Sequence, residues 1–127
     1  MRLSKADHAH TDARGSIFDI ELSEEVGAIG HVTFTDGAVR GNHVHEHTTQ
    51  WNYVVVGRLT VAVVDVDLTR HDLSIAEGDL LRIDSGEQHA FRADAPTQMM
   101  VFTMGPRAGK EYESDTIRLE APLLEER

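Results

Sequence analysis

The sequence predicts a single-domain, all-β protein that folds as a double-sheet β-barrel or jelly roll. About nine or ten short runs rich in β-branched and aromatic residues follow one another at hairpin spacing, each bounded by Gly, Asp or Ser. No stretch shows the apolar period of an amphipathic helix. At 127 residues the chain is long enough for one core, and no linker or internal repeat divides it.

Composition along the chain suggests three segments. Residues 1–15 are polar and lack a useful periodicity, so we expect a flexible N-terminal arm in which His8 and His10 are solvated rather than a metal site. Residues 16–106 form the expected barrel. Residues 107–127 are charged again, and we expect this tail to wrap the barrel, pair with a second subunit or end in a short helix.

Within the barrel, each expected strand is a run between turn residues. In chain order the runs are residues 16–22, 28–35, 39–45, 50–56, 58–68, 71–75, 80–84, 89–93 and 97–104. The run 58–68 alternates cleanly, yet both of its faces are mostly apolar. This pattern predicts a strand that is packed on both sides or lies at a subunit contact.

The charge balance excludes several classes of partner. The formal net charge is -10, with 22 acidic and 12 basic residues, so we expect no nucleic acid and no anionic membrane surface as partner. The chain has no apolar run near the roughly 20 residues that span a bilayer and no hydrophobic leader, which favours a cytoplasmic protein. It also has no cysteine, so any metal must be held by nitrogen and oxygen ligands.

Candidate site residues are concentrated between Gly37 and Gly57. His43 and His45 stand two apart, so both side chains point to one face of an extended strand. Two imidazoles on one face can reach a single metal ion. Gln50 follows five residues later.

This stretch resembles the first cupin motif, G-x5-HxH-x4-E-x6-G, with Gly37, His43, His45 and Gly57 in register and Gln50 in place of the glutamate. The chain is thereby similar to the cupins, and the resemblance implies a double-stranded β-helix, the jelly-roll barrel of that family. Small cupins generally form dimers, and exposed edge strands give a physical motive for this, so we expect a homodimer.

The second cupin motif, G-x5-PxG-x2-H-x3-N, is met by Gly78, Gly86 and His89, although Asp84 stands where proline is usual and Ala93 where asparagine is. The resemblance covers roughly residues 28–104. It implies a cavity that holds His43, His45, Gln50 and His89 together. Three imidazoles and one amide oxygen suit a divalent Zn, Fe, Ni, Co or Mn ion.

A narrower similarity lies in R-G-N-H-V-H-x4-Q, from Arg40 to Gln50, which looks like the RmlC-like small cupins that act on sugar nucleotides, the 3,4-ketoisomerases above all. This resemblance implies that His45, with His43 nearby, is the proton-shuttling base and that Arg40 helps to hold the nucleotide sugar. The tail sequence E-S-D-T-I-R resembles a C-terminal signature of the same group. The tyrosine expected upstream is missing, and His31 or Thr33 occupies its neighbourhood.

The change from glutamate to Gln50 leaves more positive charge on a bound ion, which favours polarisation of a carbonyl over activation of dioxygen. We therefore expect an isomerase or epimerase that moves a proton next to the carbonyl of a keto sugar, a small-molecule substrate. A metal-dependent polyketide cyclase, a dioxygenase and a non-catalytic binding module are the alternatives.

Strand alternation predicts the direction of further side chains. Trp51 and Tyr53 should point away from Gln50. Arg82 or Arg92 would contact an anion if either faced inward.

Overall fold

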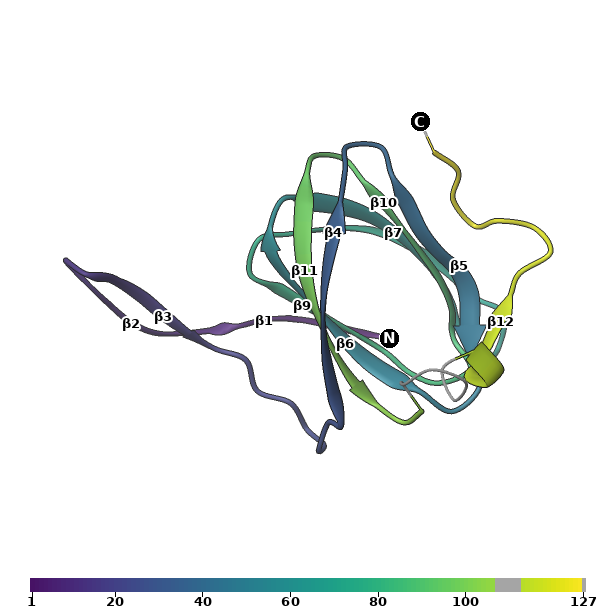
Figure 1. The fold of residues 1–127 in the computed structure, drawn as a ribbon, viewed down its shortest axis with the longest axis horizontal. Coiled ribbons are helices and arrows are strands. Elements are labelled where there is room, and N and C mark those ends of the chain that lie inside the picture. The colour runs from purple at the N-terminus through teal and green to yellow at the C-terminus, as the bar shows by residue number, and fades with distance from the viewer. Residues whose placement is uncertain (107–112, 127) are drawn as a thin grey trace.

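The computed structural model describes residues 1–106 and 113–126 and shows an all-β barrel (Figure 1). Two five-stranded sheets face each other, and a two-stranded hairpin stands apart from them. The described strands are β1 (Arg2–Lys5), β2 (Asp7–Asp12), β3 (Gly15–Asp19), β4 (Ala28–Phe34), β5 (Val39–His45), β6 (Thr49–Val56), β7 (Arg58–Val64), β8 (Arg70–Ala76), β9 (Asp79–Ile83), β10 (Gln88–Ala93), β11 (Thr97–Met104) and β12 (Thr116–Arg118). The predicted jelly-roll class is confirmed, and each of the nine runs expected from the sequence overlaps one of these strands.

The two sheets have the orders β1-β9-β6-β11-β4 and β12-β5-β10-β7-β8. All strand pairs are antiparallel. Most neighbours in a sheet are distant in sequence, as in a barrel where the chain crosses between sheets. Residues from both halves of the chain therefore meet at the middle of each sheet.

The inward faces of the two sheets form the core at one end of the barrel. Its buried members are Phe34, Val54, Leu59, Val61, Val63, Ile75, Leu81, Ile83, Phe91, Ala93, Met99 and Val101. These side chains come from alternate positions of their strands, which is the period of a sheet with one face turned inward. The other end of the space between the sheets is left open and carries the polar residues described below.

The outer face of the second sheet is covered by the C-terminal tail. Leu124 packs against Ala62 and Ala90, with Leu123 and Val39 beside them. In the run 58–68, Leu59, Val61 and Val63 thus lie in the core, whereas Ala62 on the other face lies under the tail and Val66 is 76% exposed. Tail residues Leu123 and Leu124 lie on the barrel, whereas residues 107–112 and 127 of that segment lie outside the described residues.

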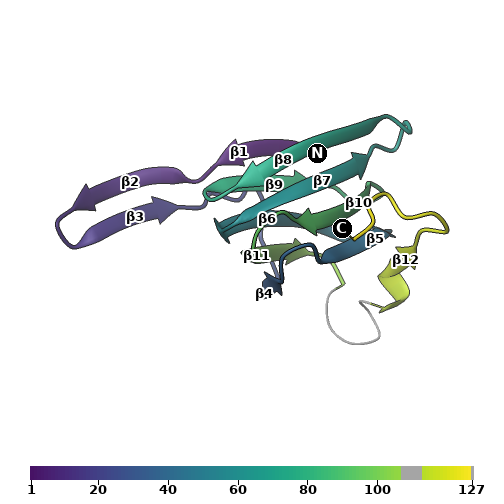
Figure 2. The same ribbon diagram turned by 90° about the horizontal axis from the view of Figure 1, so that it is seen from above.

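The first fifteen residues have more regular structure than the sequence predicted. β1 pairs with β9 at the edge of the first sheet, and β2 pairs with β3 in a hairpin that projects from the barrel (Figures 1 and 2). The residues of β1 are exposed, so the strand is held by its backbone pairing and has no apolar period to reveal it. The expected boundary between the N-terminal arm and the barrel, at residue 15, falls inside the hairpin of β2 and β3. The flexibility of this arm stays a prediction.

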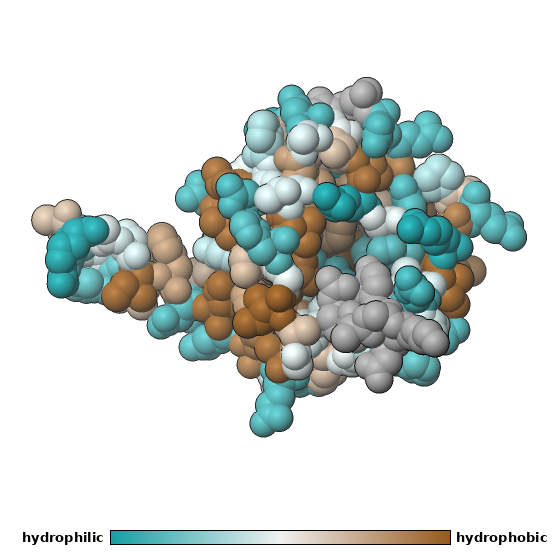
Figure 3. All heavy atoms as spheres, in the orientation of Figure 1, coloured by the Kyte–Doolittle hydropathy of each residue, from teal (hydrophilic) through white to brown (hydrophobic). Residues whose placement is uncertain are grey.

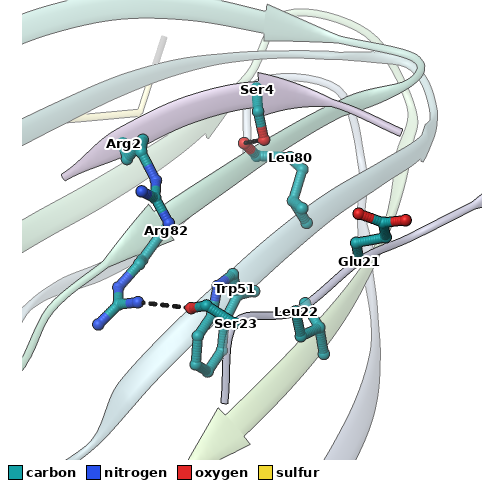
Figure 4. A pocket seen from close by; sticks show the side chains of 8 residues that line it. All are labelled: Arg2, Ser4, Glu21, Leu22, Ser23, Trp51, Leu80 and Arg82. Carbon is teal, nitrogen blue, oxygen red and sulfur yellow. Dashed lines mark hydrogen bonds between the residues drawn. The ribbon is translucent and has the colours of Figure 1, made fainter. Parts of the chain in front are cut away.

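On the outer face of the first sheet, Trp51 lies beneath the guanidinium of Arg82, whose Cζ is 5.0 Å from the ring centroid. Figure 4 shows the shallow pocket around them, where Arg82 donates to the hydroxyl of Ser23 at 2.9 Å. Arg82 also forms ion pairs with Asp84 at 2.7 Å and Glu24 at 3.0 Å. Trp51 therefore points away from the barrel interior, as the alternation from Gln50 predicted.

Among the described residues, no helix is long and apolar enough to cross a membrane.

Candidate active site

A cavity of about 440 Å³ opens between the two sheets. Figure 3 shows the hollow in the face that looks toward the viewer of Figure 1, with apolar atoms in its depth. The second sheet and its tail contribute Val39, Arg40, Gly41, His43, His45, His89, Phe91, Thr116 and Arg118. The first sheet and the adjoining turn contribute Val32, Thr48, Gln50, Met99, Val101 and Thr103. All four predicted metal ligands and Arg40 thus line one cavity.

Three of these residues form a histidine cluster. The ring centroids of His43 and His45 are 4.7 Å apart, those of His43 and His89 are 4.7 Å apart, and those of His45 and His89 are 5.3 Å apart. One ring nitrogen from each lies within 4.8 Å of the others. The pair on β5 share a face because they are two residues apart. His89 joins them because β10 pairs with β5 in a register that places it opposite His43.

Gly41 permits this close pairing of β5 and β10. Its φ is 95°, in the left-handed region, and a Cβ there would lie 2.9 Å from the carbonyl oxygen of His89 and 3.1 Å from Cα of Ala90. A side chain would therefore push the two strands apart at the residue that supplies the third imidazole. The ladder has a bulge between His89 and Ala90 at the same place.

Burial keeps two of the histidines neutral. Desolvation, helped by the neighbouring His45 and Arg118, lowers the pKa of His43 to about 4. Desolvation, helped by His43 and His45, lowers the pKa of His89 to about 3, although the hydrogen bond to the Glu87 carbonyl opposes the shift. At neutral pH both imidazoles are therefore uncharged and each keeps one lone pair for a proton, a metal or a hydrogen bond.

The ring of His45 is oriented by the C-terminal tail. Its Nδ1 lies 3.2 Å from Oγ1 of Thr116 and 3.8 Å from the carboxylate of Asp115. Asp115 is 2% exposed, and its carboxylate accepts hydrogen bonds from the His47 amide at 2.7 Å and the Thr48 hydroxyl at 2.6 Å. These contacts engage Nδ1 of His45, so a ligand in the cavity would meet this ring at Nε2.

Gln50 is fixed by a buried hydrogen-bond chain. Its Nε2 donates to Oδ1 of Asn52 at 2.8 Å, and Nδ2 of Asn52 donates to the Leu81 carbonyl at 3.0 Å. This chain commits the amide nitrogen to Asn52, so the oxygen Oε1 is the atom that Gln50 can offer to the cavity. The geometry suits either a direct ligand or a hydrogen-bond acceptor.

Two arginines lie on the wall formed by β5 and β12. Arg40 is exposed, donates through Nε and Nη2 to the Thr33 carbonyl at 3.2 and 3.1 Å, and stacks with its Cζ 5.5 Å from the Phe34 ring centroid. Arg118 stands directly opposite His43 in the β12–β5 pairing. Their charges make the cavity mouth locally positive on a chain with a net charge of -10.

Several residues weighed from the sequence lie elsewhere. His31 is on the outer face of β4, 3.2 Å from the side chain of Gln98, and Thr33 is exposed as well, so Val32 is the residue of that strand that lines the cavity. Arg82 lies on the outer face, as described above. Arg92 points outward too, toward Glu125 and Asp94. His47 is exposed in the turn after β5.

Sequence reasoning assigned no role to Asp115, Thr116 or Arg118. They are about 70 residues from the histidines along the chain, and only the edge pairing of β12 with β5 brings them to the cavity. One signal was available, the tail sequence E-S-D-T-I-R, which contains all three. It resembled a family signature but gave no indication of where the segment would lie.

Comparison with known families and structures agrees with this architecture. Residues 30–105 match the family model described as Cupin domain. Comparison with curated proteins gives no match. A 3,4-ketoisomerase from Helicobacter canadensis superposes with a TM-score of 0.79 at 18% identity, covering 92% of this chain and 89% of that one.

Two further similar structures have related descriptions. The sugar 3,4-ketoisomerase QdtA from Thermoanaerobacterium thermosaccharolyticum, in complex with TDP, superposes with a TM-score of 0.78 at 17% identity, covering 94% of this chain and 88% of that one. A dTDP-4-dehydrorhamnose 3,5-epimerase from Sulfolobus tokodaii superposes with a TM-score of 0.74 at 20% identity, covering 85% and 72%. At these identities the likeness shows a shared fold.

Proposed function

The chain belongs to the cupin domain family, and we propose that it is an isomerase that shifts the keto group of a nucleotide-linked sugar to a neighbouring carbon. The proposal rests first on the chemistry of the cavity. The structures it resembles, which include 3,4-ketoisomerases and a 3,5-epimerase, support the same reaction class.

The placement of the ionisable groups on one wall carries the proposal. Among the residues that the structure describes, all the imidazoles and guanidiniums of the cavity come from β5, β10 and β12. The facing wall presents Val32, Met99 and Val101 together with the neutral polar side chains of Thr48, Gln50 and Thr103, none of which is a base at neutral pH. A proton removed by this histidine cluster is therefore returned to the same face of the substrate. This favours a keto shift between adjacent carbons over an epimerisation, which needs a proton from the opposite face.

His45 is the proposed base. Its Nε2 accepts the proton from the carbon next to the carbonyl, and the electron pair of that C–H bond moves to give an enediolate. The neighbouring hydroxyl proton then moves to the former carbonyl oxygen. His45, after exchanging its proton with solvent, protonates the former carbonyl carbon, which completes the isomerisation without an oxidant or reductant. The buried Asp115 carboxylate, 3.8 Å from Nδ1, stabilises the imidazolium that forms in between.

His43 and the arginines have supporting roles in this proposal. With a pKa of about 4, His43 is neutral at pH 7 and donates or accepts a hydrogen bond at the enediolate oxygens. Arg40 and Arg118 provide paired N–H donors for phosphate oxygens at the mouth. One similar structure was solved with TDP and another with TDP-4-keto-6-deoxyglucose, which supports a sugar nucleotide as substrate. A cavity of about 440 Å³ falls in the range of small-molecule sites, roughly 300–1,000 Å³.

The same residues fit a divalent metal ion. Nε2 of His89 is buried without a hydrogen-bond partner while its Nδ1 lies 3.1 Å from the Glu87 carbonyl, the arrangement of a metal-ligating histidine oriented by its other nitrogen. His43, His45, His89 and Gln50 would hold the ion, and it would supply Lewis-acid polarisation of the substrate carbonyl. Ligation through Nε2 of His45 would occupy the atom proposed to accept the proton, so that nitrogen serves one role or the other.

The test is turnover of TDP-4-keto-6-deoxyglucose in D₂O by protein purified without a histidine tag, followed by NMR and preceded by metal analysis. We expect the keto group to move to the neighbouring carbon, with deuterium entering at the former carbonyl carbon. His45→Ala should abolish this, and His47→Ala, an exposed histidine of the adjacent turn, is the matched control. Unchanged turnover in His45→Ala would refute the assignment of the base.

Other outcomes would support the alternatives. Oxygen consumption that depends on a bound metal would indicate a dioxygenase, and ring closure of a polyketide would indicate a cyclase. A rise in melting temperature with ligand, without product from any keto-sugar nucleotide, would indicate a binding module.

The proposed assembly is a homodimer formed through the first sheet and the hairpin. Ile17 and Phe18 on the hairpin are 56% and 52% exposed, and Ile29 and Val55 on the outer face of the sheet are 62% and 39% exposed. A two-stranded hairpin gains little stability alone, and a second copy is a natural cover for both surfaces. Light scattering should give twice the chain mass, and Phe18→Asp should give monomers. A monomeric wild type would exclude the dimer.

A further inference from the structure

Asn42 separates Gly41 from His43 in β5 and has a φ of 55°. This is the left-handed region, which asparagine tolerates better than most residues. The amide of Asn42 is directed to the C-terminal tail. Its Oδ1 accepts from the amides of Leu123 at 2.7 Å and Leu124 at 3.2 Å, and its Nδ2 donates to the Leu124 carbonyl at 3.0 Å.

The main chain of Asn42 binds the tail as well. Its carbonyl accepts a hydrogen bond from the Leu119 amide at 3.0 Å. One residue thus holds the tail at two points, residue 119 and residues 123–124. Other anchors nearby are the packing of Leu124 on Ala62 and Ala90, a hydrogen bond from Arg70 to the Leu123 carbonyl at 3.0 Å, and one from Arg92 to the Glu125 carbonyl at 3.4 Å.

The tail segment just before these points is the part that reaches the cavity. β12 has three residues, and its pairing sets Thr116 opposite His45 and Arg118 opposite His43. A three-residue edge strand is a weak element, so its position depends on what fixes the chain on either side. On one side Asp115 is tied to Thr48 and His47. On the other side the fixed point is Asn42.

We infer that Asn42 is a positioning residue, which docks the C-terminal tail so that Thr116 orients His45 and Arg118 stays at the cavity mouth. It acts through the tail, because its own side chain does not line the cavity. The effect on catalysis rests on the proposed function, whereas the effect on the imidazole of His45 does not.

The test compares Asn42→Gly, Leu124→Ala and the double variant. Glycine accepts the φ of 55° without strain, so Asn42→Gly removes the amide contacts alone. Leu124→Ala loosens the same tail by an independent contact. We expect each single variant to raise amide hydrogen exchange at residues 116–119 and to shift the ¹⁵N resonances of the His45 ring in the same direction. The double variant should change little beyond the larger single effect.

Turnover gives the second readout. Displacement of a positioned group typically costs up to about 10²-fold, and we expect a loss of ~10-fold or more in kcat for Asn42→Gly with a smaller change in KM. Asn42→Asp keeps both acceptor contacts and loses the donor, so it should fall between glycine and wild type. The control is Thr60→Ala. It removes a hydrogen bond of 2.6 Å between the Thr60 hydroxyl and the Asp94 carboxylate, which lies away from the cavity, so the His45 ring resonances should stay unchanged.

Unchanged His45 resonances and exchange at residues 116–119 in Asn42→Gly would overturn the inference, whatever the activity. If the resonances shift as expected but no keto-sugar nucleotide is turned over by the wild type, the docking role stands and the proposed function fails. The inference would also be overturned if the shifts of the His45 ring resonances in Asn42→Gly and Leu124→Ala were fully additive in the double variant. Additive shifts would mean that the two residues affect the ring by separate routes.

Discussion

Replacement of His89 by glutamine should flatten the acid dependence of stability. The folded chain holds the pKa of His89 at about 3, while the unfolded chain has the ordinary value of about 6.5. Below pH 6.5 the unfolded state therefore binds a proton that the folded state does not, so stability is complete above that pH and falls as the pH falls toward 3. From pH 7 to pH 4.5 this single group removes about 2–3 kcal/mol from the free energy of unfolding.

The assay is urea unfolding in chelator at several pH values, followed by the fluorescence of Trp51, the one tryptophan of the chain. The wild type and His89→Gln will differ in unfolding free energy by some amount at pH 7. Between pH 7 and pH 4.5 that difference should change by about 2–3 kcal/mol. His43 contributes in the same direction by a smaller amount, because it is partly exposed.

His31→Gln is the matched control, because it removes an imidazole from the outer face of the first sheet. This exposed histidine therefore controls for the loss of an imidazole at a site outside the cavity. Parallel curves for His89→Gln and wild type would refute the reasoning, because they would show that burial of this imidazole leaves its proton affinity unchanged.

Three further predictions concern the walls of the cavity. Asp115→Asn should lower kcat by about 10²-fold with little change in melting temperature, measured by steady-state kinetics, and an unchanged kcat would exclude the carboxylate from proton transfer. Arg118→Ala should raise KM for the sugar nucleotide by about 10-fold or more, because a charge-assisted hydrogen bond is worth roughly 1.5–3 kcal/mol, and a change confined to kcat would contradict a binding role. Gly41→Ala should destabilise the fold by about 1–3 kcal/mol in urea unfolding, through its φ of 95° and its contact with the His89 carbonyl, and wild-type stability would contradict that close approach.

Local sequence patterns were sufficient to predict the strands β3 to β11, because each is a short run rich in β-branched and aromatic residues with turn residues at its ends. They failed for β1 and β2, which have no buried face to impose an apolar period and are held by backbone pairing to β9 and β3. For β1 the pairing partner β9 is also distant in the chain. A single segment carries no signal of it.

The sequence predicted the three histidines of the cluster by two different kinds of evidence. The spacing of His43 and His45 places them on one face by strand geometry alone. His89 needed the family spacing, since nothing local indicates that β10 will pair with β5. The outward direction of Arg92 follows from the alternation that starts at His89. The tail residues Asp115 and Arg118 could not be placed, because the edge pairing of β12 is again non-local.

The separation of the two cavity walls has a consequence for protein engineering. Val32, Met99 and Val101 shape the space that the proposed sugar substrate would occupy, yet they belong to strands that carry none of the imidazoles of the cavity. Substitutions there can enlarge or narrow the cavity while the hydrogen bonds of Asp115 and the register of β5 with β10 stay intact. A library confined to these three positions would therefore vary which sugar is accepted while sparing the groups that move the proton.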